Sequence, residues 1–211
     1  MSEINNSQTM NAETQAKVTP DIAIELLKKG NERFVQSKPL NRDLPQQIKN
    51  TANGQWPFAA VLGCVDSRVP NEMVFDQGIG DIFSVRIAGN FVNTDILGSL
   101  EYACAVANSK AIVVLGHEGC GAVKSACDYV EAGNITSMLA NITPSVEATP
   151  EEGDRSSKNA GFVKKVIQKN VELTIANMRE RSSILLDLER EGKITIAGAL
   201  YDLATGQVRW L

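Results

Sequence analysis

Four side chains in two short segments have the types and spacing expected of a metal site. The only histidine of the chain, His117, and Cys120 stand in the segment Gly-His-Glu-Gly-Cys-Gly. Cys64 and Asp66 stand in a second segment, Gly-Cys-Val-Asp-Ser-Arg. Imidazole nitrogen and thiolate sulfur together are donors that suit zinc. Two ligands in one segment do not complete a site, so this chemistry requires a fold that brings the two segments together.

Each segment follows a short apolar run that ends at a glycine. These runs, 58–63 and 111–115, are typical of buried strands in a parallel sheet. Open α/β sheets usually place their chemistry at the carboxyl ends of such strands. Two parallel strands have their carboxyl ends at the same edge of the sheet, so we expect Cys64, Asp66, His117 and Cys120 to converge.

The rest of the chain predicts the α/β class: a central, mostly parallel sheet of four strands plus an antiparallel edge strand, flanked by helices, with an N-terminal helical arm. Further strands are expected over 81–87, 193–200 and 207–211. Helix-start signals and apolar stripes predict helices from 19, 94, 121 and 184, and a long one after 158. Residues 141–158 carry prolines and many polar side chains, which predict a surface loop.

Composition limits the domain organisation and the class of partner. Residues 1–18 are polar and predict a disordered N-terminal arm, and residues 19–211 predict a single domain. The net charge of −4 without a basic face argues against nucleic acid. No apolar run approaches roughly 18 residues, and no targeting segment is evident, so we expect no membrane partner and a cytoplasmic location with reduced cysteines.

The two segments resemble the signature of the β-class carbonic anhydrases, Cys-x-Asp-Ser-Arg at 64–68 and His-x-x-Cys at 117–120. The resemblance extends through 81–90 and 99–103, and covers roughly residue 19 to the C-terminus except 141–158. It implies that Cys64, His117 and Cys120 bind Zn²⁺. It also implies that zinc-bound hydroxide hydrates CO₂ reversibly to bicarbonate and a proton.

The same resemblance implies roles for seven residues around the three metal ligands. Asp66 and Arg68 would form a catalytic dyad: Arg68 holds Asp66, and Asp66 orients the hydroxide. If Arg68 released it, Asp66 would become the fourth metal ligand and close the site. Five residues match the substrate-binding pocket of the family: Gln55, Phe83, Ala88, Tyr102 and Gly121. In the family this pocket lies at the interface of a homodimer, so a dimer or a dimer of dimers is expected.

Three other functions are compatible with these residues. A hydrolase acting on CS₂ or COS could use the same zinc framework, with a tunnel that excludes CO₂. A metal-free thiol enzyme could use Cys64 or Cys120 as nucleophile and His117 as base. A noncatalytic, zinc-stabilised interaction domain is the third, and in such a domain the spacing of Asp66 and Arg68 would serve no purpose.

If His117 is a metal ligand, no histidine is left to carry the released proton to solvent. Proton transfer then depends on water, buffer or another side chain. We expect turnover in stopped-flow CO₂ hydration to fall when an imidazole buffer is replaced by a non-buffering salt. Turnover that is insensitive to the buffer would contradict this inference.

Overall fold

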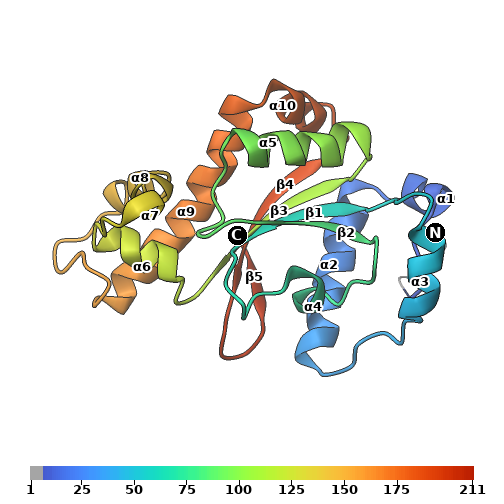
Figure 1. Cartoon of the computed structure of the whole chain (residues 1–211), viewed down its shortest axis with the longest axis horizontal. Helices are drawn as coiled ribbons and strands as arrows, with labels where there is room; N and C mark the ends of the chain where they lie inside the picture. The colour runs from blue at the N-terminus through green and yellow to red at the C-terminus, as the bar shows by residue number, and fades with distance from the viewer. Residues whose placement is uncertain (1–6) are drawn as a thin grey trace.

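The computed structural model describes residues 7–211. Five strands form one sheet in the order β2-β1-β3-β4-β5. Their bounds are β1 (Ala59–Gly63), β2 (Ile82–Arg86), β3 (Ala111–His117), β4 (Thr195–Tyr201) and β5 (Val208–Trp210). The first four are parallel to one another, and β5 pairs antiparallel with β4 (Figure 1). The predicted α/β class and sheet architecture are confirmed.

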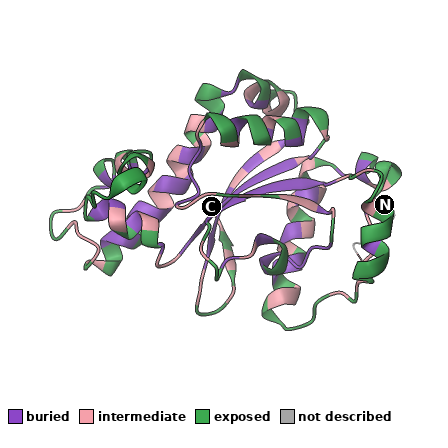
Figure 2. Cartoon of the chain, in the orientation of Figure 1, coloured by how far each residue is buried: buried purple, intermediate pink, exposed green. Residues whose placement is uncertain are grey.

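Helices cover both faces of the sheet. One face packs against α5 (Thr94–Glu101), a following π-helix (Tyr102–Val106), α9 (Ala160–Arg181) and α10 (Ser183–Arg190); the other packs against α2 (Pro20–Val35) and α4 (Asn71–Val74). Successive residues of β3 alternate between two cores, because strand side chains point to opposite faces. Ile112 and Val114 lie in the first core, and Val113 and Leu115 in the second. Figure 2 shows the resulting pattern of buried strands and exposed outer helix surfaces.

Three short helices gather beside the first half of α9: α6 (Gly121–Cys127), α7 (Gly133–Leu139) and α8 (Thr143–Glu147) (Figure 1). The prediction of a surface loop over 141–158 is therefore wrong for its first part. Pro144 occupies the first turn of α8, where the missing N–H of proline is tolerated. Ser145 and Val146 are buried against α9.

The structure also differs from the expected disordered arm over residues 7–18; residues 1–6 lie outside the described part of the chain. Helix α1 (Ala12–Ala16) is capped by Asn11. The buried amide of Gln15 donates hydrogen bonds of 2.8 Å to the carbonyl oxygens of Pro57 and Ala107. A polar side chain thus anchors this segment. Helix α3 (Leu44–Thr51) lies near this N-terminal segment (Figure 1). Among the helices within residues 7–211, none is long and apolar enough to cross a membrane.

Gly30 is required where α2 meets the end of α4. A Cβ atom at this position would lie 1.8 Å from the carbonyl oxygen of Phe75. Alanine normally stabilises a helix interior by about 1 kcal/mol relative to glycine. Here we expect Gly30→Ala to lower the free energy of unfolding by about 1–3 kcal/mol, because α2 must move away from its core.

The matched control is Gly98→Ala in α5, where a Cβ atom would meet no described atom within 4 Å. That variant should be as stable as the parent chain or more stable. Denaturant unfolding measures both changes. Equal stabilisation by the two substitutions would show that the contact at Gly30 does not constrain the packing of α2.

Candidate metal centre

The adjacent strands β1 and β3 bring the two predicted segments to one edge of the sheet. Cys64 follows directly after β1, His117 is the last residue of β3, and Cys120 is the residue before α6. The ligand atoms of these three buried residues lie within 4.8 Å of one another. The two sulfur atoms are 3.9 Å apart. The structure therefore brings together three side chains that could hold a metal ion.

The imidazole of His117 is oriented by the backbone of the next residue. Its Nδ1 lies 2.9 Å from the carbonyl oxygen of Glu118, and the Glu118 N–H in turn donates to the carbonyl oxygen of Tyr201 at 3.0 Å. With the proton on Nδ1, the lone pair of Nε2 is free for a metal. This Nε2 is buried and has no hydrogen-bond partner among residues 7–211. A buried nitrogen without a partner is costly, and a bound cation would remove that cost.

The two thiols share a hydrogen bond and so perturb each other. That bond lowers the pKa of Cys64 to about 4, with further lowering by the adjacent His117 side chain and by the Gly89 N–H, which lies 3.3 Å from Sγ. The same bond and burial raise the pKa of Cys120 well above its usual range. The two thiols therefore differ in how readily they ionise, and a metal ion held by both would displace the proton between them.

Asp66 and Arg68 form an ion pair next to the ligands. The Arg68 Nε donates to Oδ1 at 2.9 Å, its Nη2 to Oδ2 at 2.7 Å, and its backbone N–H to Oδ1 at 3.0 Å. These bonds hold the pKa of the Asp66 carboxyl well below its usual range, so the group is ionised at neutral pH. The Asp66 Oδ2 lies 3.9 Å from the Nε2 of His117. The carboxylate therefore faces the ligand cluster while arginine holds it.

Arg86 holds the backbone of the loop that carries Cys64 and Asp66. This role was not predicted from the sequence. Its Nε donates to the carbonyl oxygen of Cys64 at 2.8 Å and its Nη2 to that of Asp66 at 2.6 Å. Arg86 ends β2, which is parallel to β1 and adjacent to it. The strand-end argument that identified Cys64 could have identified Arg86 too. The Gly89 N–H has no comparable signal in the sequence, because any non-proline residue carries one.

The structure gathers some of the predicted substrate residues and leaves one apart. The rings of Phe83 and Tyr102 meet edge to face with centroids 6.2 Å apart, and both line an open pocket of about 580 Å³ between β2 and α5. Ala88 is half-buried beside Gly89, and Gly121 begins α6 directly after Cys120. Gln55 is exposed between α3 and β1. No hydrogen bond joins it to the ligand cluster in the described part of the chain.

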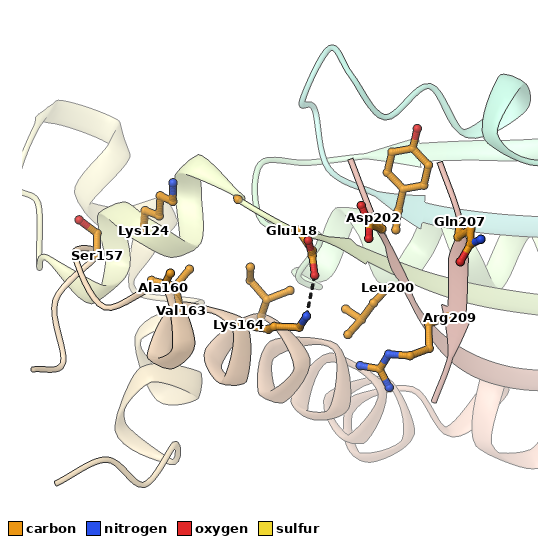
Figure 3. Close-up of a pocket in the computed structure, with 13 residues that line it drawn as sticks. Glu118, Lys124, Ser157, Ala160, Val163, Lys164, Leu200, Asp202, Gln207 and Arg209 are labelled. Carbon is orange, nitrogen blue, oxygen red and sulfur yellow. Dashed lines mark ion pairs between the residues drawn. The ribbon is translucent and has the colours of Figure 1, made fainter. Parts of the chain in front are cut away.

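A separate pocket of about 460 Å³ adjoins the loop between His117 and Cys120 (Figure 3). Glu118 of this loop pairs with Lys164 of α9 at 2.8 Å, and both side chains line the pocket. Its lining combines acidic and basic side chains with apolar ones such as Leu200. Of the described residues that form the lining, none is one of the three ligand residues. The same holds for the pocket between β2 and α5, so neither pocket contains a ligand residue in its lining.

Comparison with known proteins gives consistent matches over most of the chain. Residues 59–208 match the family model described as carbonic anhydrase. Carbonic anhydrase 2 of Mycobacterium tuberculosis is 37% identical over 196 residues, which cover 89% of this chain and 91% of that protein. The carbonic anhydrase of Mycolicibacterium smegmatis is 38% identical over 197 residues, covering 90% of this chain and 92% of that protein.

Solved structures agree with these relatives. The beta-carbonic anhydrase of Coccomyxa, in complex with acetazolamide, superimposes with a TM-score of 0.70 and 28% identity, over 77% of this chain and 75% of that chain. One of two tetrameric beta-carbonic anhydrases from Sordaria macrospora gives a TM-score of 0.67 and 27% identity, over 79% of this chain and 86% of that chain.

The convergence of the three ligand atoms predicts one divalent metal ion per chain. We expect Cys120→Ala to lose this ion, because two remaining ligands do not hold it against a chelator. Cys127→Ala is the matched control, since Cys127 is also a buried free thiol and ends α6, the helix that Cys120 precedes. Metal analysis after dialysis against chelator compares the two. Equal metal content in both variants would place the ion elsewhere.

Proposed function

Because the chain belongs to the β-class carbonic anhydrases, we propose that it catalyses the reversible hydration of CO₂ to bicarbonate and a proton, with zinc held by Cys64, His117 and Cys120. One observation carries the proposal: two buried sulfur atoms and an unpartnered imidazole nitrogen meet beside an ionised aspartate. A structural zinc site is filled by four protein ligands, whereas a catalytic site keeps one position open. Three ligands and a carboxylate held aside by arginine fit the second kind.

The donor set and its spacing fit zinc. Tetrahedral zinc with Zn–S bonds of about 2.3 Å places two sulfur ligands about 3.8 Å apart. The sulfur atoms of Cys64 and Cys120 are 3.9 Å apart, so little movement is needed. When bound at such a site, zinc makes a nucleophile available from water near neutral pH.

Asp66 is proposed to orient the attacking oxygen. Its carboxylate is ionised at neutral pH and can only accept hydrogen bonds, so it selects one orientation of an O–H group beside the ligand cluster. Arg68 donates a hydrogen bond to each carboxylate oxygen and so holds Asp66 beside the ligand cluster as a group that does not coordinate the metal. An Asp66 freed from Arg68 is the group that would close the site as a fourth ligand.

We propose that the CO₂ pocket is formed by Phe83, Ala88, Tyr102 and Gly121 together with Gln55 of a second copy of the chain. Tyr102 is 51% exposed although its ring packs on Phe83, and Gln55 lies away from its own ligand cluster. Both observations suit a pocket that is completed when a second copy of the chain binds. The tetrameric Sordaria macrospora proteins support a homodimer or a dimer of dimers.

We propose a cytoplasmic location because the cysteines are free thiols. All four are free thiols in the described structure, and two of them are required as metal ligands. Thiols are kept reduced in the cytoplasm, whereas oxidising compartments favour disulfides.

Stopped-flow CO₂ hydration, with zinc measured on the same sample, tests the proposed function. We expect Arg68→Ala to retain zinc but to lose about 100-fold in kcat/KM, because Asp66 is no longer held where it orients the attacking oxygen and is free to close the site as a fourth ligand. Arg179→Ala is the control, since Arg179 also makes a two-bond ion pair with a carboxylate, that of Glu189. It should keep the parent rate. A zinc-loaded parent chain that does not hydrate CO₂ would refute the proposal.

A further inference from the structure

The backbone N–H that contacts the Cys64 sulfur belongs to a tight turn over residues 87–90. The turn is closed by a 2.9 Å hydrogen bond from the Asn90 N–H to the Ile87 carbonyl oxygen. Gly89 has φ +81°, the value that a type II turn requires at its third residue. The turn has few internal degrees of freedom. Holding one end of Gly89 therefore also fixes the direction of its N–H toward Cys64.

Asn170 of α9 holds that end. Its Nδ2 donates a 2.7 Å hydrogen bond to the Gly89 carbonyl oxygen, and the contact is buried. The other half of the same amide, Oδ1, accepts a hydrogen bond from the Ser145 Oγ at 3.3 Å. Asn170 and Ser145 are each only 2% exposed. The serine thereby fixes which side of the amide faces Gly89.

Packing adds a second contact between the same segment and the turn. Ile142, which precedes α8 and is fully buried, lies so close that a Cβ atom on Gly89 would be 2.4 Å from its Cδ1. Ile142 and Ser145 both come from residues 141–158, which contain none of the metal-ligand motifs. This segment therefore contacts the turn in two ways: directly through Ile142, and through the hydrogen bond of Ser145 to Asn170.

We propose that Asn170, oriented by Ser145, is a positioning residue of the metal centre: it fixes the 87–90 turn so that the Gly89 N–H donates to the Cys64 sulfur. The inference rests on the proposed zinc site. A hydrogen bond to a ligating sulfur fixes the direction in which the sulfur faces the metal position, and it also lowers the energy of the sulfur lone pair. Groups that orient metal ligands in this way typically contribute 10- to 100-fold to metal affinity.

The test is zinc affinity, measured by competition with a chelator on the full chain. Asn170→Leu keeps a similar side-chain volume but has no donor, and should weaken zinc binding about 10- to 100-fold. Ser145→Ala should weaken it in the same direction by a smaller factor. Thr174→Val is the matched control, because Thr174 is equally buried one turn further along α9. It should bind zinc as the parent chain does.

The cobalt-substituted proteins give a readout that a general loss of stability would not produce. Loss of the hydrogen bond raises the energy of the sulfur lone pair, so the thiolate-to-cobalt absorption band of Asn170→Leu should move to longer wavelength. That of Thr174→Val should not move. Parent affinity and an unshifted band in Asn170→Leu would overturn the inference.

The two proposals fail in different ways. A parent chain that binds no zinc refutes the metal site itself, whereas a zinc-binding parent with an unaffected Asn170→Leu refutes only the role of Asn170. If Asn170→Leu does not fold, Ser145→Ala decides: weakened binding supports the inference, and parent affinity overturns it.

Discussion

The parallel pairing of β1 with β3 is the constraint on which the metal centre depends. Leu62 is in register with Val114, so the two strands end at the same edge of the sheet, β1 just before Cys64 and β3 at His117. Every residue of both strands is buried. Burying this apolar surface is strongly favourable and offsets the cost of removing two sulfur atoms and an imidazole from water. The ligands are therefore positioned by the sheet before any metal binds, and the short loops beyond the strands only have to turn their side chains inward.

Charge balance sets the second requirement of the site. With both thiols ionised, the two sulfur atoms and the Asp66 carboxylate would place three negative charges close together, and Arg68 offers one positive charge beside them. Without a cation the thiols reduce this repulsion by sharing a proton, which is why the pKa of one is lowered and that of the other is raised. A divalent cation neutralises the remainder. These charges would attract a doubly charged ion more strongly than a monovalent one, independently of the identity of any relative.

The sequence predicted the features that depend on local pattern, and it missed those that depend on distant partners. Apolar runs ending in glycine predicted β1 and β3, and the spacing of His117 and Cys120 predicted the ligand cluster. Gln15 stands in a polar stretch where nothing signals burial. Asn170, in contrast, lies on the apolar stripe of α9 between Ile167 and Val171, so the sequence could indicate its burial but not its partner. Their partners are backbone carbonyl groups 42 to 92 residues away, at Pro57, Ala107 and Gly89. Any residue type supplies such an acceptor, so only the folded chain reveals the contact.

The ion pair between Asp66 and Arg68 is well suited to a choice between two arrangements because its arginine is exposed. The Arg68 side chain is 57% exposed, so water and salt screen its attraction for the carboxylate. What holds Asp66 is the geometry of three hydrogen bonds from a residue two positions further along the same loop. The Arg68 guanidinium can turn into solvent, whereas the Asp66 side chain is only 16% exposed and would stay beside the ligand cluster in need of a new partner. Meanwhile Arg86 keeps the backbone at Cys64 and Asp66 in place. Changing the partner of Asp66 therefore requires a side-chain rotation and leaves the sheet edge undisturbed, so the proposed opening and closing of the site would not require a change in the fold.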